Sequence, residues 1–340
     1  MYLIAGPCSL ESNQQLEAVA SQASRYDLIR CGVWKPRTHP GGFEGLGEEG
    51  LRLIAECRQR HPGLKFCCEV ARPAHVDLAL RYGIDALWIG ARTTADPFSV
   101  SEIAAALRGA AVPVMVKNAP APDVETWLGA IERIEKAGVP RIIAVHRGFA
   151  VLHSGQYRND PLWEIPIQLR RRRPDLMLLC DPSHIAGQAS LVRTVAQNAL
   201  LLGFDGLMVE THPHPDQALT DARQQITPEQ LREMIDSLSQ PANNAQPPVA
   251  LQHLRAQIDD LDHQLLQLLA HRMEVSRQIA EVKKQHNIVV LQSGRWQQLM
   301  DDKLRQAEAF GLDADFVRNI FEQIHTQSIN QQLYHTKPSQ

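Results

Sequence analysis

The amino-acid sequence predicts a (β/α)8 barrel followed by an all-helical domain of three helices. Three observations lead to this fold class. Short apolar runs alternate with amphipathic helical patterns through residues 1–238. A stretch rich in Pro, Asn and Gln at 239–249 has no apolar period, and only helical spacing follows at 250–337. The length of 340 residues also exceeds what one compact domain usually holds.

The first region contains eight strand-then-helix units. The apolar runs are 2–8, 28–35, 65–70, 86–91, 112–118, 141–149, 177–184 and 206–213. Continuous apolar runs are typical of parallel strands that are covered on both faces. Eight such units fit a closed barrel, whereas a doubly wound open sheet, the alternative, usually has fewer strands. The last helix of this region is expected at 228–238.

The second region is predicted to begin with one long helix. Residues 239–249 are predicted to be a linker. Apolar residues then recur at three–four spacing from Leu251 to Val282, along a helix of about 35 residues and about 50 Å. Two shorter helices are expected near 295–310 and 315–333. Because these cannot cover so long an apolar seam, we expect the region to form a homodimer.

Composition excludes two classes of partner. The net charge of −3 and the lack of a long basic run exclude nucleic-acid binding. No uncharged apolar stretch is long enough to span a membrane. The first residues lack an export signal, and the six cysteines are expected to be reduced thiols. We therefore expect a cytoplasmic protein.

Polar residues gather at the predicted strand ends, where barrel enzymes place their reacting groups. One set mixes a thiol, an imidazole and two carboxylates: Cys8, His184, Glu210 and Asp221. This mixture suits a first-row transition metal and leaves Mn, Fe, Co and Zn open. A second set is cationic and indicates substrates with phosphates and a carboxylate. It consists of Arg30, Lys35, Arg37, Arg92, Lys117 and Arg147.

Six motifs then carry a family resemblance. They are IAGPCSLES (4–12), KPRT (35–38), IGAR (89–92), VMVKN (114–118), DPSH (181–184) and ETHPHPDQALTDARQ (210–224). In this order they resemble the type I-beta DAHP synthases, which condense phosphoenolpyruvate with erythrose 4-phosphate to 3-deoxy-D-arabino-heptulosonate 7-phosphate. The resemblance implies a divalent metal, with Mn²⁺ expected, on the four residues of the mixed set.

The same resemblance implies roles for the cations and for one acid. Phosphoenolpyruvate is expected on Arg30, Lys35, Arg92, Lys117 and Arg147. Erythrose 4-phosphate is expected on Arg37 and Thr38. Glu69 is expected to place the attacking water, and Lys35 to donate a proton to the new alkoxide.

Two features of the barrel depart from many relatives. Thr93–Asp96 replaces an Asn-rich stretch after IGAR, and His146 replaces a Glu before Arg147. We expect His146, His212 and His214 to be rim residues rather than metal ligands. The alternative to this function is a KDO8P synthase, which uses arabinose 5-phosphate, joined to a helical dimerisation module. Such enzymes carry a KANR-like motif where this chain has KPRT.

The helical region carries a second set of candidate site residues. Arg272 continues the apolar seam, and Lys283 projects from the same helix face about 20° away. Ser328 and Gln332 likewise share a face. Residues 250–335 resemble the AroQ-class chorismate mutases, which need no cofactor.

That resemblance implies substrate contacts for six residues of the helical region. They are Arg255, Arg272, Lys283, Arg295, Ser328 and Gln332. The arginines are expected to clamp the carboxylates of chorismate, with Arg255 reaching the partner's site. Lys283 and Gln332 are expected to donate to the ether oxygen. Trp296 and Gln292 stand where relatives commonly have acids. We also expect chorismate or prephenate, bound here, to inhibit the barrel.

Overall fold

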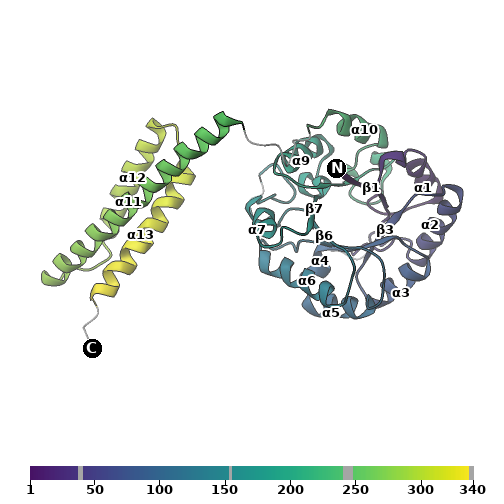
Figure 1. Cartoon of the computed structure of the whole chain (residues 1–340), viewed down its shortest axis with the longest axis horizontal. Coiled ribbons are helices and arrows are strands. Elements are labelled where there is room, and N and C mark those ends of the chain that lie inside the picture. The colour runs from purple at the N-terminus through teal and green to yellow at the C-terminus, as the bar shows by residue number, and fades with distance from the viewer. Residues whose placement is uncertain (37–40, 153–154, 240–247, 337–340) are drawn as a thin grey trace. The chain divides into compact units, whose positions relative to one another are not determined.

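The computed structural model describes residues 1–36, 41–152, 155–239 and 248–336. Arg37 and Thr38, and most of the predicted linker, therefore lie outside the described residues. The chain forms two compact units, Met1–Asn243 and Asn244–Gln340, each of which is considered by itself (Figure 1).

The first unit is a closed barrel of parallel strands in the order β1 to β8. Each strand pairs with the next, and β1 pairs with β8 from Tyr2↔Gly206 to Gly6↔Glu210, which closes the ring. The strands are β1 (Tyr2–Gly6), β2 (Leu28–Arg30), β3 (Phe66–Val70), β4 (Ala86–Ile89), β5 (Val114–Lys117), β6 (Ile142–His146), β7 (Met177–Cys180) and β8 (Gly206–Glu210). The predicted fold class is confirmed.

Helices surround the barrel (Figure 1). Two helices follow β4, and two follow β7. Their starts follow local capping chemistry: Asp123 accepts from the backbone amides of Glu125 and Thr126, and Thr227 and Gln230 form a capping box. The helices are α1 (Asn13–Ala20), α2 (Glu48–Arg60), α3 (Pro73–Arg81), α4 (Ala91–Thr94), α5 (Pro97–Ala106), α6 (Val124–Lys136), α7 (Glu164–Arg172), α8 (Pro182–Ala186), α9 (Ala189–Leu201) and α10 (Pro228–Ser237).

Alternation along each strand separates two apolar layers. Side chains such as Ile4, Trp88 and Met115 form a cluster of their own. The neighbouring residues, such as Ala5 and Val116, belong to the larger layer that also includes the helices. Because successive side chains point to opposite faces of a sheet, the smaller cluster fills the inside of the barrel.

Two strands end earlier than the apolar runs predict. β2 ends at Arg30, so Lys35 lies in the following loop rather than on the strand. The apolar run extends past the strand because the following loop is buried at Val33. At Lys35 the backbone of this loop bonds within the loop rather than to a neighbouring strand. The amide of Lys35 donates to Glu44 O. β1 similarly ends at Gly6, two residues before Cys8. Periodicity reports burial and cannot distinguish a buried loop from a paired strand.

The second unit consists of three helices: α11 (Val249–Gln285), α12 (Ser293–Ala309) and α13 (Ala314–Thr336). The predicted long helix is present, with 37 residues. Helix α13 packs against both others. Much of the apolar seam of α11 stays exposed, with Leu261 at 58% and Leu268 at 68% of full exposure. Within the described part of the chain, no helix combines the length and the apolar character that crossing a membrane requires.

Candidate active sites

In six barrel strands, the inward-facing side chains end in a charged residue. This residue lies at the carboxyl end of the strand or just beyond it. Below these residues the same faces carry Leu28, Cys67, Met115, Val145, Leu179 and Met208. Two residues further along each strand stand Arg30, Glu69, Lys117, Arg147, Asp181 and Glu210. A period of two keeps them on the inside, so the strands deliver six charged groups to one end of the barrel.

Three of these groups, Glu69, Lys117 and Arg147, border a cavity of about 680 Å³. Its lining includes predicted residues from several loops as well as from the strands. They are Lys35, Glu69, Arg92, Lys117, Arg147, His184 and Asp221, and the lining also contains Arg158 and Asn159. Arg92 is exposed at the cavity and donates to Pro36 O at 2.9 Å. The structure thus brings most of the predicted barrel residues around one space.

Three of the four predicted metal ligands come together. Ligand atoms of Cys8, Glu210 and Asp221 lie within 4.8 Å of one another. His184 lies at the edge of this group, with its Nε2 3.7 Å from Glu210 Oε1. Glu210 is fully buried. A buried carboxylate beside a thiol and a second carboxylate offers a donor set that fits a divalent transition metal.

Electrostatics around this group depend on neighbouring cations. Lys35 Nζ lies 2.8 Å from Asp221 Oδ2 and also contacts Cys8 Sγ. Burial disfavours a charged Asp221, but Lys35 and the other cations outweigh it and hold the pKa of this carboxyl below its usual range. Burial, together with Glu210, raises the pKa of the Cys8 thiol. Binding of a metal here must therefore release the thiol proton.

Asp221 also has an unusual backbone. Its φ of 47° and ψ of 34° place it in the left-handed region, which Asp tolerates better than most residues. From this position one carboxylate oxygen faces Lys35 while the other lies 3.0 Å from Arg158 Nη1. The strained backbone is consistent with a residue placed for function.

Asp181 is a central residue of the site that the sequence reasoning did not single out. Its Oδ2 lies 2.6 Å from Lys117 Nζ and 2.8 Å from His184 Nδ1, and 3.9 Å from Arg30 Nη1. The carboxylate is fully buried. Its place on the inward face, two residues after Leu179, is the signal that could have identified it. Asp181 fixes the positions of three predicted site residues.

Arg30 is buried deepest of the cations, at 2% exposure, with Nη2 2.9 Å from Glu210 Oε1. Arg147, by contrast, forms no ion pair within the described chain. It donates to Asn159 Oδ1 at 2.7 Å, and burial lowers its pKa to about 10. A partly buried guanidinium that forms a hydrogen bond to a neutral amide and no ion pair suits an anionic ligand. Arg158, also missed in the sequence, adds another cation to the cavity.

Glu69 approaches the cavity from β3 and accepts a hydrogen bond from Trp88 Nε1 at 3.1 Å. Burial raises the pKa of this carboxyl, although Lys117 and Lys35 oppose the shift. Gly90 makes its position possible, because a Cβ on Gly90 would lie 2.0 Å from Glu69 Oε1. A carboxyl that is easily protonated suits a group that handles water and protons.

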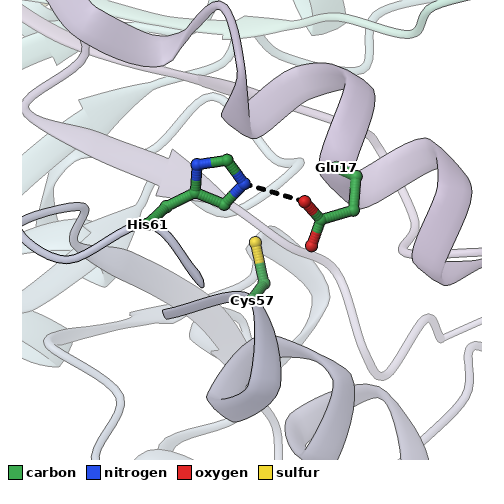
Figure 2. Close-up of side chains that lie close together, drawn as sticks. All are labelled: Glu17, Cys57 and His61. Carbon is green, nitrogen blue, oxygen red and sulfur yellow. Dashed lines mark hydrogen bonds and ion pairs between the residues drawn. The ribbon is translucent and has the colours of Figure 1, made fainter. Parts of the chain in front are cut away.

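A second group of metal-type side chains lies away from the barrel site, between α1 and α2 (Figure 2). His61 Nε2 is 2.8 Å from Glu17 Oε2, and Cys57 Sγ points toward both. Here Arg60 already pairs with Glu17 at 2.6 Å. Burial, followed by Glu17, raises the pKa of Cys57 to about 12. The charge of Glu17 is balanced by Arg60, and the thiol of Cys57 stays protonated. This group therefore links α1 to α2.

The predicted rim position is wrong for one of the three histidines, His146. His146 is fully buried, and its ring lies 5.4 Å from that of Trp163 and 5.6 Å from that of Phe149. It ends β6 with its side chain in the outward layer, since Val145 and Arg147 face inward. His212 is 6% exposed and lies 3.5 Å from Glu11, whereas His214 is exposed.

The helical unit brings together four of its six predicted residues. Arg272 donates to Ser328 Oγ, and Lys283 Nζ lies 3.3 Å from Gln332 Oε1. Gln332 also donates to Ser276 Oγ at 3.3 Å. Arg255 and Arg295 are exposed, and among the described residues no hydrogen bond or ion pair joins either of them to this group. The site within one chain is therefore built by α11 and α13.

Comparisons with known proteins agree with both units. The sequence model of the DAHP synthetase I family matches residues 1–246, which is more than half of the chain. The chain belongs to the DAHP synthetase I family. A phospho-2-dehydro-3-deoxyheptonate aldolase of Thermotoga maritima is 31% identical over 243 residues, which cover 71% of this chain and 70% of the relative. A crystal structure of the DAHP synthase of that organism superposes with a TM-score of 0.62 at 29% identity, covering 69% of this chain and 67% of that one.

Beyond the part that the DAHP synthetase I family matches, the model of chorismate mutase type II matches residues 254–333. A 4-amino-4-deoxychorismate mutase of Streptomyces venezuelae is 36% identical over 77 residues, or 23% of this chain and 75% of the relative. The recognition of both families from sequence motifs is confirmed. The protein is accordingly an enzyme with a DAHP synthase unit and a chorismate mutase unit.

Proposed function

We propose that the barrel condenses phosphoenolpyruvate with erythrose 4-phosphate at a divalent metal, while the helical unit converts chorismate to prephenate. The single observation that carries the barrel assignment is the cavity in which Lys35, Lys117 and Arg147 lie beside Asp221. Asp221 belongs to the group of metal-type side chains with Cys8 and Glu210. Cations beside a metal-type ligand set suit two phosphorylated substrates. Both reactions belong to aromatic biosynthesis through the shikimate pathway.

The metal would be held by Cys8, Glu210 and Asp221, with His184 as the fourth ligand. Mn²⁺ is the metal we propose, and Fe, Co and Zn suit the same donors. When bound, the ion supplies Lewis acidity toward the aldehyde oxygen of the sugar phosphate. Asp181 Oδ2 lies 2.8 Å from His184 Nδ1, which would orient the ring nitrogen that faces Glu210.

The side chains of the barrel supply binding and proton transfer. Arg30, Lys117 and Arg147 would hold phosphoenolpyruvate, with Lys35 and Arg92 contacting the same substrate. Arg37 and Thr38 remain a prediction for the sugar phosphate, since they lie outside the described residues. Glu69, with its raised pKa, would orient the water that adds to the enol-derived carbon. Lys35 Nζ would donate the proton to the new alkoxide.

In the helical unit, Arg272 and Ser328 would bind the dicarboxylate and hold its compact conformer. Lys283 and Gln332, which already approach each other, would donate to the ether oxygen as negative charge develops there. Arg295 and the partner's copy of Arg255 would complete the site. The exposed apolar seam of α11 supports a homodimer, since a free seam of this length is costly in water.

Two further expectations belong to the same proposal. We propose a cytoplasmic protein because all six cysteines are unpaired thiols. We also propose that chorismate or prephenate, bound to the helical unit, inhibits the barrel. Such coupling requires that the ligand bind one arrangement of the protein more tightly than another. Prephenate added to the full-length chain should lower phosphoenolpyruvate consumption, and unchanged rates at saturating prephenate would exclude this regulation.

The experiment that tests the barrel measures phosphoenolpyruvate consumption by metal-stripped protein, with and without added Mn²⁺. Erythrose 4-phosphate and arabinose 5-phosphate are compared in parallel. Mn²⁺-dependent turnover with the four-carbon sugar alone is the expected result. Preference for arabinose 5-phosphate would instead assign the barrel to KDO8P synthesis. For the helical unit, Arg272→Ala should abolish chorismate turnover while the dimer persists, which a pure dimerisation module would not show.

A further inference from the structure

A pair of stacked rings borders the candidate mutase site. Trp296 on α12 and His325 on α13 lie with ring centroids 3.9 Å apart and planes inclined by 16°. His325 precedes Ser328 by three residues and Gln332 by seven, so all three share one face of α13. The pair therefore adds α12 to a site that α11 and α13 otherwise build.

His325 has an unused hydrogen-bonding group. Its Nε2 is buried, and no described residue provides it with a hydrogen bond. Buried polar atoms are rarely left without a partner, and an exception calls for a ligand, an ion or a water. Stacking against Trp296 fixes the plane of the ring and so limits the directions in which Nε2 can form a hydrogen bond.

The surroundings determine the charge of this ring. Burial, followed by the nearby cations Arg272 and Lys283, lowers the pKa of His325. A neutral imidazole has one nitrogen that accepts a hydrogen bond. The groups of α11 around it are donors, suited to carboxylates and the ether oxygen. The ring hydroxyl of chorismate can donate a hydrogen bond, and Trp296, which follows Arg295, offers no acceptor for it.

We propose that His325, held in place by Trp296, accepts the hydrogen bond of the ring hydroxyl of chorismate. This inference rests on the proposed mutase function and names the group that positions the hydroxyl end of the substrate. His325 is a specificity residue in this assignment. Trp296 is a positioning residue, because it acts through the ring that it stacks on.

The test compares chorismate with an analogue whose ring hydroxyl is replaced by hydrogen, using the full-length protein and the variants H325L, H325Q and W296F. A site that uses a hydrogen bond to the hydroxyl discriminates against the analogue. For one hydrogen bond we expect about tenfold preference for chorismate in kcat/KM. H325L should lose about tenfold on chorismate and nothing on the analogue, which abolishes the preference.

The other variants separate the hydrogen bond from packing. H325Q keeps an acceptor and should restore part of the preference, whereas W296F keeps an aromatic ring and should keep most of it. Equal losses on both substrates in H325L would assign His325 to packing and overturn the inference. An unchanged preference in H325L would also overturn it. If R272A still rearranges chorismate at the wild-type rate, the proposed mutase site itself is wrong.

Discussion

Lys117 Nζ and Asp181 Oδ2 lie 2.6 Å apart in the barrel, where their side chains are 5% and 0% exposed. The same carboxylate oxygen also approaches His184 and Arg30. One buried anion thus balances a cation proposed to bind phosphoenolpyruvate and orients a proposed metal ligand. The binding and metal halves of the site are coupled through Asp181.

Asp181→Asn should therefore lower both stability and activity. Removing one charge of a buried pair leaves Lys117 uncompensated, and we expect the free energy of unfolding to fall by about 3 kcal/mol. Denaturant unfolding and initial rates of phosphoenolpyruvate consumption measure the two effects. Asp205→Asn is the matched control, because Asp205 pairs with Arg170 where both side chains are about one-third exposed, and such pairs contribute little. Equal losses in the two variants would contradict the role of Asp181.

Cys8→Ser should weaken metal binding at the barrel site. A hydroxyl binds a borderline metal less well than a thiolate, and we expect at least the roughly tenfold loss that removal of an outer-shell partner causes. The measurement is the Mn²⁺ concentration that half-restores activity after chelation. Cys57→Ser is the control, taken from the group of Glu17, Cys57 and His61 that links α1 to α2 (Figure 2). Its Mn²⁺ requirement should equal that of the wild type, and a shift there would place a functional metal at that group.

Gly90→Ala should impair the barrel reaction with little effect on folding. The added Cβ would lie 2.0 Å from Glu69 Oε1, so the carboxylate must move away from its position beside Trp88. We expect kcat for phosphoenolpyruvate consumption to fall by about tenfold or more. This is a small loss compared with the full rate contribution of a general acid or base. Gly129→Ala is the control on α6, where the new Cβ meets only the flexible end of Arg133. An unchanged kcat in Gly90→Ala would remove Glu69 from the reaction.

His146→Phe should make stability less dependent on pH. Burial lowers the pKa of His146 to about 3, below its ordinary 6.5, so below pH 6.5 the unfolded chain binds a proton that the folded chain does not. This group therefore makes wild-type stability fall as pH decreases, by up to about 1.4 kcal/mol per pH unit. Unfolding at about pH 5, 6.5 and 8 measures the slope. The stability of the variant relative to the wild type should therefore increase from about pH 8 to about pH 5. Parallel curves would refute the buried neutral ring.

Leu265→Glu should separate the subunits of the proposed homodimer. Leu265 belongs to the exposed seam of α11, at 55% exposure, and a carboxylate there would be buried in a dimer without a partner. We expect a monomer by sedimentation and loss of chorismate turnover, because the partner's Arg255 no longer completes the site. Phosphoenolpyruvate consumption should persist. Gln267→Glu, on the opposite side of the same helix, should remain dimeric. A dimeric Leu265→Glu protein would place the interface elsewhere.

Much of the architecture could be predicted from local patterns. Eight apolar runs of strand length predict the barrel, and the period of two explains why Arg30, Lys117 and Glu210 share one end of it. The motifs of the barrel region predict the DAHP synthase family, and the residues of the helical region predict the chorismate mutase family. The three–four spacing from Leu251 onward predicts the long helix α11.

The sequence by itself therefore determined the order of elements, the inward faces and the chemical types gathered at the strand ends, because these depend on periodicity along the chain. Tertiary structure alone decided which loop residues join them. Asp181 and Arg158 acquire their importance from contacts with Lys117 and Asp221, which lie 64 and 63 residues away. His146 became a core residue because its aromatic neighbours come from separate segments. Contacts between distant segments depend on packing in three dimensions, which no local pattern records.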